Sequence, residues 1–315
     1  MTHVCPICTT ADCRVYREGS ITSLRPDMIG SSRTTTAAGR ILRCERCGFG
    51  FSELRSSPDQ MAEVYRDMDL SLYEAESRRR ARTAANHLRI VSRYVTPPGD
   101  ILDVGCASGL FLKAAADAGW RVTGIEPSEG LSIKASSLLA EAGTVHTATL
   151  DNCTLPPQSF DALTLFDVLE HVPDSPGFLA SCAALLKPGG WMFLNVPDLD
   201  SWEARILGSR WPLLLPEHLN YFNRNSLRLC GTRAGLALER FGRRPAWFSV
   251  EYVSYRLAQH GIPGARLTHQ LVQSTAFGNL SIPIFLGETY AVFRRPKIHA
   301  RLNGIQPEDI RSGSM

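Results

Sequence analysis

The sequence contains no apolar run that is long enough to cross a membrane. The longest segment without acidic or basic residues, 267–287, is interrupted by two glutamines, an asparagine and a proline. A spanning helix needs about 20 mostly apolar residues, so this segment is expected to be buried or interfacial protein. The first eight residues, MTHVCPIC, also lack the basic start and apolar core of a secretory signal. These absences predict a soluble cytoplasmic protein, whose cysteines are thiols or metal ligands rather than disulfides.

A large excess of charge of either sign is also missing. Lys and Arg number 34 and Asp and Glu 31, a net charge of +3, which does not by itself predict nucleic-acid binding. Glycine and proline, 25 and 19 residues, are too few for a collagenous or low-complexity chain, and 44% hydrophobic residues suffice for a full core. The length of 315 residues suggests about two domains, at ~150 residues each.

The nine cysteines are concentrated near the N-terminus, where five occur within the first 47 residues. Four of them form two pairs with a two-residue gap, Cys5 with Cys8 and Cys44 with Cys47. This gap lets both thiolates of a pair bind one ion, and two pairs provide the tetrahedral sulfur set that Zn²⁺ prefers. The 35 residues between the pairs exceed the usual spacing of ~15–20, so the Ser-, Thr- and Gly-rich segment 30–39 is expected to form a protruding loop or a hairpin. Cys13 is expected to be a free thiol.

Changes in composition divide the chain into four segments. Apolar residues recur at helical intervals from Tyr73 to Val91, where four arginines, at 78, 79, 80 and 82, predict a solvated helix face. The sequence Thr96-Pro97-Pro98-Gly99 then ends the helix. The expected organisation is a zinc-ribbon-like module at 1–56, a helical linker or cover at 57–98, a main domain at 99–296 and a polar tail at 297–315.

From residue 99 onward, short apolar runs alternate with helical patterns. The expected strands are 100–104, 120–126, 162–166 and 191–196, with helices at 110–118, 130–142 and 177–186 and a tight turn at 187–190. A helix at 226–235 and strands at 237–241 and 289–294 follow, with an insert of about 243–288 that contains helices near 251–260 and 268–275. This alternation predicts a doubly wound α/β fold with parallel strands, in which ligands bind at the carboxyl ends of strands.

Glycines and a carboxylate follow the first two of these strands. The first strand leads into Asp103-Val-Gly105-Cys-Ala107-Ser-Gly109, and the second ends at Glu126. Glycines let a ligand approach the backbone, and a carboxylate at the second strand can accept both hydroxyls of a ribose. The dinucleotide pattern G-x-G-x-x-G is absent, because Ala107 and Leu110 occupy two of its glycine positions, and so is the Gly-Lys-Ser/Thr phosphate loop. An adenosine ligand without phosphates is therefore expected.

Four segments resemble, in their order and spacing, the class I S-adenosylmethionine (SAM)-dependent methyltransferases: ILDVGCASGLFL, GIEPS, LPPQSFDALTLFDVLEHVPD and LLKPGGWMFLNVPD. The resemblance covers roughly residues 99–295 and implies a Rossmann-like, seven-stranded sheet that binds SAM. The cysteine pairs, followed by a helical segment with Tyr65 and Tyr73, resemble the zinc-ribbon-bearing branch of the family. That branch is often associated with methylation of sugars, polysaccharides or secondary metabolites, which implies a small-molecule acceptor and a structural or docking role for zinc.

The resemblance also implies which residues bind SAM. Gly105 and Gly109 would line its methionine and ribose parts, and Glu126 would hold the ribose hydroxyls. Asp151 lies where the family commonly has the acidic residue that meets the adenine amino group. Ala107 stands where a glycine is common in the family. The full expected set is Asp103, Gly105, Cys106, Ala107, Gly109, Glu126, Pro127, Asp151, Asn152, Phe166 and Asp167.

Two histidines are the candidate catalytic residues on the acceptor side. His171 in VLEHVPD and His218 in PEHLNYF are each candidates for a general base, because an unperturbed imidazole titrates near pH 6.5. His171 could equally cap a helix or orient its loop, and the segment around His218 could be a packed cover. Tyr73, Trp211 and Tyr221 are the expected substrate contacts.

Three functions are compatible with these patterns. Methylation of a small molecule is favoured, such as a sugar, nucleotide sugar, polysaccharide precursor or secondary metabolite, with oxygen, nitrogen and carbon all open as the acceptor atom. Methylation of RNA gripped by the zinc module is disfavoured by the small net charge and the lack of interleaved aromatic and basic residues. A non-catalytic interaction protein with a vestigial cofactor fold is disfavoured by the intact glycine loop and Glu126.

Overall fold

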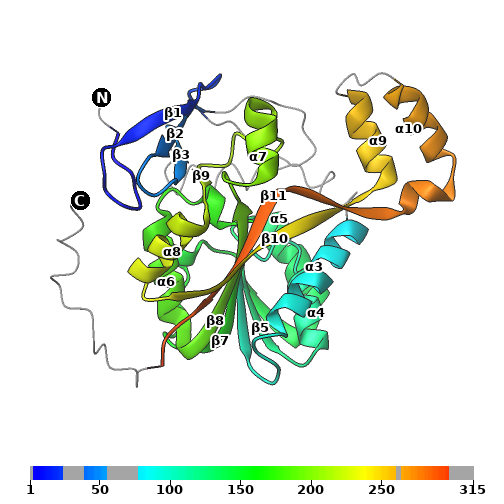
Figure 1. Cartoon of the computed structure of the whole chain (residues 1–315). Coiled ribbons are helices and arrows are strands. Elements are labelled where there is room, and N and C mark those ends of the chain that lie inside the picture. The colour runs from blue at the N-terminus through cyan, green and yellow to red at the C-terminus, as the bar shows by residue number, and fades with distance from the viewer. Residues whose placement is uncertain (1–2, 24–38, 55–76, 260–263, 298–315) are drawn as a thin grey trace.

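One large β-sheet forms the centre of the molecule (Figure 1). The computed structural model describes residues 3–23, 39–54, 77–259 and 264–297. The sheet has seven strands in the order β10-β11-β8-β7-β4-β5-β6, which confirms the expected α/β fold. These strands are β4 Asp100–Val104, β5 Arg121–Ile125, β6 Gly143–His146, β7 Phe160–Phe166, β8 Leu186–Pro197, β10 Ala237–Ser249 and β11 Ser281–Arg294.

Helices cover both faces of this sheet. Strands β6, β5, β4, β7 and β8 are parallel, whereas β11 is antiparallel to both of its neighbours, β8 and β10. Side chains alternate between the faces of a strand, so Leu102 and Val104 of β4 enter one apolar cluster and Ile101 enters another. Helices α6 and α8 complete the first cluster, and α3, α4 and α5 complete the second. These helices are α3 Ser77–Val91, α4 Leu110–Asp117, α5 Glu129–Leu139, α6 Ser175–Leu185 and α8 Arg224–Arg233.

Capping side chains account for where several helices begin. The Asp174 carboxylate accepts the Gly177 amide at the start of α6. Asn223 and Ser226 exchange side-chain and backbone bonds in a capping box at the start of α8. Such bonds satisfy amides that have no partner within the helix. The remaining short helices are α7 Trp202–Leu207 and the 3₁₀ helices η2 Ala140–Ala142, η3 Leu150–Asn152, η4 Leu169–His171, η5 Gly208–Arg210 and η6 Ala276–Asn279.

In the main sheet, the structure differs from the expected elements in one turn and three strands, of which β6 is not among the strands expected from the sequence. The turn expected at 187–190 lies within strand β8. Phe160 of β7 pairs with Leu186 and Ala162 pairs with Trp191, so the residues between Leu186 and Trp191 form a bulge in β8. Strands β10 and β11 continue past their expected ends as a paired arm as far as Ser249 and Ser281. Cross-strand pairing satisfies the backbone groups of this arm, which carries α9 (Val250–Gln259) and α10 (Ala265–Gln273) away from the main sheet (Figure 1).

A second, smaller sheet contains the N-terminal cysteines. It pairs β1 (Cys13–Arg17), β2 (Ile41–Cys44), β3 (Gly50–Ser52) and β9 (Asn220–Tyr221) in that order, all antiparallel. Because β9 comes from the middle of the chain, this sheet joins the N-terminal segment to the main domain (Figure 1). Most of the expected protruding segment, Tyr65, Tyr73 and the tail after residue 297 lie outside the described residues.

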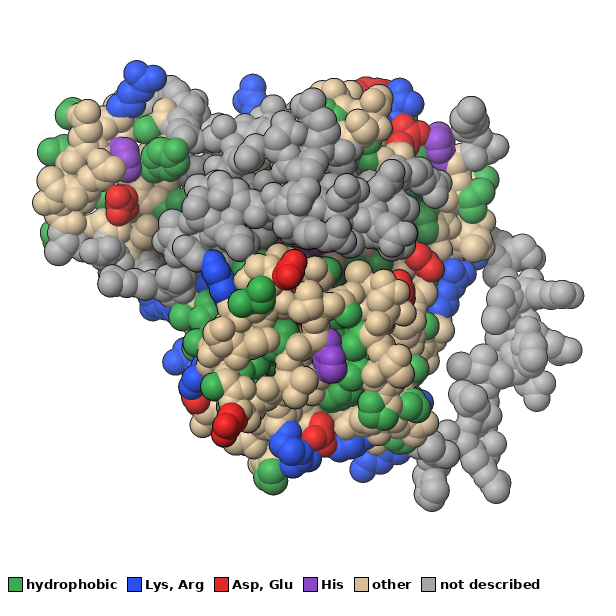
Figure 2. Space-filling model, turned by 180° about the vertical axis from the view of Figure 1, so that it is seen from behind, with side chains coloured by type: hydrophobic (Ala, Val, Ile, Leu, Met, Phe, Trp, Pro, Cys, Tyr) green, Lys and Arg blue, Asp and Glu red, His purple; other side chains and the backbone are tan. Residues whose placement is uncertain are grey.

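Exposed apolar side chains gather on the unit formed by α9, α10 and η6, at the left of Figure 2. Leu267, Leu271, Phe277 and Leu280 are each more than half exposed. Within the part of the chain that the structure describes, no helix is both long and apolar enough to span a membrane. The paired strands β10 and β11 connect this unit to the main sheet.

The contact between α8 and β11 yields a test of the packing. A Cβ atom on Gly231 would lie 2.3 Å from Cε1 of Phe293, whose side chain is fully buried. We expect Gly231→Ala to lower the free energy of unfolding by about 1–3 kcal/mol through overpacking, despite the better helix propensity of alanine. Thr232→Ala, at an exposed position of α8, should change it by less than about 0.5 kcal/mol. Urea denaturation of both variants measures the difference, and equal stabilities would contradict the packing described.

Candidate functional site

The loop after β4 is closed onto the end of β5. The Gly105 amide donates to the Ile125 carbonyl at 2.8 Å. The Glu126 carboxylate accepts the Ala107 amide at 2.8 Å through Oε2 and the Ser128 amide at 2.9 Å through Oε1. The glycine loop and the carboxylate therefore form one unit at the carboxyl edge of two neighbouring parallel strands, where such folds bind ligands.

The backbone of this loop adopts conformations that glycine favours. Gly105 has a φ of +79°, Gly109 has +78° and Ala107, where a glycine is common in the family, has +49°. A Cβ atom on Gly105 would also lie 2.6 Å from Cγ2 of Val168. Both the turn and the close approach of the next loop therefore require glycine at 105. Alanine at 107 keeps the left-handed conformation at a modest cost.

Two buried carboxyl groups lie under the loop. Asp103 on β4 is 4% exposed, and the Thr164 hydroxyl donates to its Oδ1 at 2.6 Å. Burial raises the pKa of Asp103 to about 7. Burial also raises the pKa of Glu126, although the amides of Ser128 and Ala107 oppose that effect. A cationic ligand beside these groups would favour their charged forms, so the site is electrostatically suited to a cation.

The other residues expected to bind SAM differ in how deeply their side chains are buried. The Cys106 side chain is buried below the loop, where a Cβ atom on Gly124 would lie 2.7 Å from its Sγ. Only the backbone of Cys106 can therefore face a ligand above the loop. Pro127 is half-buried directly after Glu126, whereas Asp151 and Asn152 are exposed on η3, which follows the neighbouring strand β6.

Phe166 and Asp167 lie where β7 ends. The Phe166 ring stacks on His87 of α3 with a centroid distance of 3.7 Å and meets Phe111 of α4 edge-on at 5.3 Å. Asp167, with a φ of +57°, donates its amide to Asn195 Oδ1 at 3.1 Å and accepts a bond from the Asn195 side-chain amide. The Asp167 carboxylate is thus held at the strand ends next to the glycine loop.

The structure brings the two predicted histidines together. The rings of His171, at the end of η4, and His218 meet edge to face with a centroid distance of 4.9 Å. Nδ1 of His171 lies 3.0 Å from the Glu217 carbonyl, and Nδ1 of His218 lies 2.9 Å from the Leu213 carbonyl. A carbonyl only accepts hydrogen bonds, so each Nδ1 carries the proton and Nε2 is the basic nitrogen of the neutral ring.

The electrostatics of the histidine pair favour the neutral rings. Burial lowers the pKa of His171 and lowers that of His218 well below its ordinary value, with the charge of His171 adding to the effect on His218. Glu170, 2% exposed, lies beside them, and burial raises its pKa well above the ordinary range. One ring nitrogen of each histidine and one Glu170 oxygen all lie within 4.8 Å of one another. These three residues could therefore transfer protons or hold a cation.

The expected aromatic substrate contacts form the wall behind this pair. The Trp211 indole donates to the Leu286 carbonyl at 2.6 Å, and the Tyr221 hydroxyl donates to the Leu215 carbonyl at 3.5 Å. Both side chains are almost fully buried and contact each other, with a ring distance of 6.1 Å. In the structure their main interactions are therefore with the protein itself. Tyr73 lies outside the described residues.

Sequence reasoning missed several polar residues of this region. His87 is 5% exposed on α3, and its Nε2 has no hydrogen-bond partner among the described residues. Asn195 and Asn220 are also buried. Asn195 interrupts the apolar run WMFLNV of β8, and a polar residue inside a buried strand is a usable signal. His87 gives no such signal, because nothing in a helical pattern reveals that its ring stacks on a distant phenylalanine.

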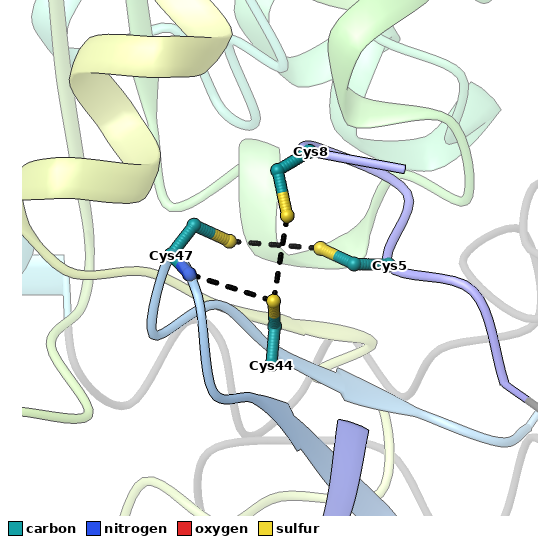
Figure 3. Close-up of side chains that lie close together, drawn as sticks. All are labelled: Cys5, Cys8, Cys44 and Cys47. Carbon is teal, nitrogen blue, oxygen red and sulfur yellow. Dashed lines mark hydrogen bonds between the residues drawn. The ribbon is translucent and has the colours of Figure 1, made fainter. Parts of the chain in front are cut away.

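The four paired cysteines converge in the N-terminal module (Figure 3). The sulfurs of Cys5 and Cys47 are 3.6 Å apart, those of Cys8 and Cys44 are 3.4 Å apart, and all four lie within 4.8 Å of one another. A tetrahedral Zn²⁺ with sulfur ligands at 2.3 Å separates its sulfurs by about 3.8 Å, so the arrangement fits this ion. Cys13 is not part of the cluster, and burial raises the pKa of its thiol to about 12.

The main domain matches known methyltransferases in sequence. A family model described as a methyltransferase domain matches residues 75–240, more than half of the chain. A ubiquinone biosynthesis O-methyltransferase of Xanthomonas campestris pv. campestris is 35% identical over 161 residues, 48% of this chain and 67% of that protein. Its counterpart in Chromobacterium violaceum is 31% identical over 169 residues, 49% of this chain and 72% of that protein. The chain thus spans about two thirds of the length of these relatives, and only 65% for the Thiobacillus denitrificans enzyme of that name.

A solved structure supports the same fold. This structure is the complex between the Haloferax volcanii Trm112 methyltransferase activator and a methyltransferase. One of its chains aligns over its whole length (100%) with 76% of the present chain, with a TM-score of 0.51 and 16% sequence identity. The region matched in sequence contains the glycine loop, Glu126 and both histidines. The chain belongs to the class I SAM-dependent methyltransferase family.

Proposed function

We propose that the protein transfers the methyl group of SAM to a hydroxyl oxygen of a small-molecule acceptor. The observation that carries the proposal is the arrangement of the strand ends. The glycine loop and Glu126 form a donor site after β4 and β5, and the histidine pair lies beyond the ends of β7 and β8. The relatives named as O-methyltransferases favour oxygen as the acceptor atom and a quinone-like or other small secondary metabolite as the acceptor.

On the donor side, the chain supplies binding and orientation. Bound SAM provides an activated methyl group on a sulfonium. Glu126 would accept the ribose hydroxyls, and the backbone of the loop from Gly105 to Gly109, held by left-handed glycines after β4, would contact the methionine part. Asp103, with its raised pKa, would become charged beside the ammonium of SAM. Orientation of this kind can supply about 7–11 kcal/mol of barrier reduction.

On the acceptor side, the chain would supply the base. A neutral imidazole with its proton fixed on Nδ1 offers Nε2 to the acceptor hydroxyl, and the backbone carbonyls of Glu217 and Leu213 keep each ring in that form. His218 is buried and His171 is partly buried, which would limit the access of water that competes for the methyl group. We assign the base to His171 and a substrate contact to His218.

The cysteine cluster is proposed to hold one structural Zn²⁺ within the module at residues 1–56. Four thiolates this close repel one another unless a cation lies between them, and the sulfur distances suit zinc. The segment 57–98 is proposed to be a cover of the main domain at 99–296, because α3 packs on α4 and places His87 against Phe166.

The donor site is tested by Glu126→Ala. Loss of the carboxylate should weaken SAM binding by ~1.5–3 kcal/mol, the range for hydrogen bonds to a charged group. Isothermal titration calorimetry measures the change, and Glu129→Ala, at an exposed position in the first turn of α5, serves as the control with unchanged affinity. Binding of NAD instead of SAM by the wild type would overturn the assignment.

The metal site is tested by removing two of its ligands. Elemental analysis should find one zinc per chain in protein purified without chelator and none in the Cys44→Ser, Cys47→Ser double variant. Because binding of a structural metal contributes directly to folding, the double variant should also lose the cooperative melting of the module. Cys13→Ser is the matched control, since Cys13 pairs with Cys44 in the sheet but lies outside the cluster. Full zinc content in the double variant would show that the ligands are wrong.

The base is tested by His171→Ala and His218→Ala. If the proposal is right, His171→Ala lowers kcat by ~10²–10⁴-fold with SAM affinity unchanged, whereas His218→Ala mainly raises the KM of the acceptor. Burial lowers both histidine pKa values, so the neutral base persists below pH 6.5 and the rate should fall only in more acidic solution. His269→Ala, on α10, is the control.

The acceptor needed for this assay comes from a screen of metabolite extracts with methyl-labelled SAM, in which labelled oxygen ethers are the expected products. Two histidine variants with wild-type rates and pH profiles would exclude histidine catalysis. A strict requirement for an added divalent metal would assign the cluster of Glu170, His171 and His218 to metal binding instead of proton transfer.

A further inference from the structure

The cysteine module pairs through its strand β3 with the backbone segment that follows His218. Strand β3 begins three residues after Cys47 and pairs with β9, with Gly50 opposite Tyr221 and Phe51 opposite Asn220. The Ser52 amide extends this pairing by donating to the Leu219 carbonyl at 2.8 Å. Residue 219 directly follows His218 in the sequence. The module therefore holds the backbone that carries one of the two histidines.

The same short segment also holds the other histidine. The Asn220 side-chain amide donates to the Leu169 carbonyl at 3.3 Å and to the Val172 carbonyl at 2.6 Å, one on each side of His171. We call these two bonds the Asn220 clamp. Between them, the Leu219 amide donates to the Glu170 carbonyl at 2.8 Å. Residues 219–220 thus connect the module on one side with η4 on the other.

Packing makes this connection rigid. Cys5, Cys44 and Cys47 belong to the same buried cluster as Leu165 and Leu169, next to the histidine loop. Phe49, two residues after Cys47, packs on Phe222, just after β9, at a ring distance of 5.1 Å. The same cluster also contains Val104 and Ile125, but the hydrogen bonds of the glycine loop and of Glu126 are made within that loop and to β5 and its following turn. Loss of order in the module should therefore disturb the acceptor side first.

We infer that the four-cysteine module positions the acceptor-side histidines, and that Asn220 is the positioning residue that transmits this effect to His171. That these histidines face an acceptor rests on the proposed function, but the structural coupling does not. The module fixes β9, β9 fixes Asn220, and Asn220 fixes the two ends of η4. A metal in the cysteine cluster would keep Phe49, Gly50 and Phe51 in place, because they lie only two to four residues after Cys47.

The first test removes the metal and needs no acceptor. The full-length zinc-loaded protein is compared with chelator-treated protein by hydrogen exchange and by calorimetry with S-adenosylhomocysteine. We expect amide exchange in residues 217–222 to increase about tenfold or more together with that of residues 39–54. Affinity for S-adenosylhomocysteine should change by less than about threefold, since the donor loop does not depend on the module. Faster exchange in residues 39–54 with unchanged exchange in 217–222 would overturn the inference.

The second test breaks the clamp while the metal stays bound. Asn220→Ala should speed exchange in residues 169–172 and leave the zinc content at the wild-type value. It should also raise the pKa of His171, followed by NMR, toward 6.5, because loosening η4 admits more water to a partly buried ring whose pKa is now lowered. A merely local packing defect would not shift this titration.

The control for the clamp is Asn225→Ala. Asn225 also bonds to the module, through the Cys47 carbonyl at 3.4 Å, but lies on α8 away from η4, so it should leave the titration of His171 unchanged. An unchanged His171 pKa in Asn220→Ala would refute the inference. Coupled exchange in a protein that binds no S-adenosylhomocysteine would refute the proposed function and leave this inference standing.

Discussion

The parallel pairing of β4 with β5 and β7 is the constraint on which the rest of the molecule depends. It places Val104 beside Ile125 and Asp103 beside Thr164, so the three strands end at one edge and their following loops must meet there. After β4 the chain reverses direction in a small space. This accounts for the glycine at 105, where a Cβ atom would collide with the Val168 side chain. Sheets of this kind bind ligands at such an edge, because the loops that follow the parallel strands gather there.

Burial shifts the pKa values of titratable groups on both sides of this edge. On the donor side, Asp103 and Glu126 have raised pKa values and carry hydrogen bonds that a cationic ligand would reinforce. On the proposed acceptor side, burial lowers the pKa values of the two histidines and raises the pKa of Glu170. All of these shifts favour uncharged groups in the ligand-free protein. Ionisation of these buried groups therefore depends on charged ligands that bind beside them rather than on solvent.

The second sheet links the N-terminal cysteine module to the main domain. Its last strand, β9, belongs to the main domain, and the strand is only two residues long. A strand this short depends on its partner for order, since isolated pairs of this length are not stable in water. The module and the histidine loop consequently share one hydrophobic cluster, in which Phe49 and Phe222 are in contact.

The sequence by itself determined the α/β fold, the donor loop and the cysteine cluster, because these depend on local patterns. Alternating apolar runs specify strands, the positions of Gly105 and Gly109 specify a turn, and a two-residue gap between paired cysteines lets both sulfurs face the same side. Long-range contacts were decided only by the tertiary structure. The continuation of β10 and β11 as an arm, the stacking of His87 on Phe166, and the clamp from Asn220 to η4 join residues that are far apart in the chain. No local pattern encodes such contacts, since they depend on how the whole sheet brings its loops together.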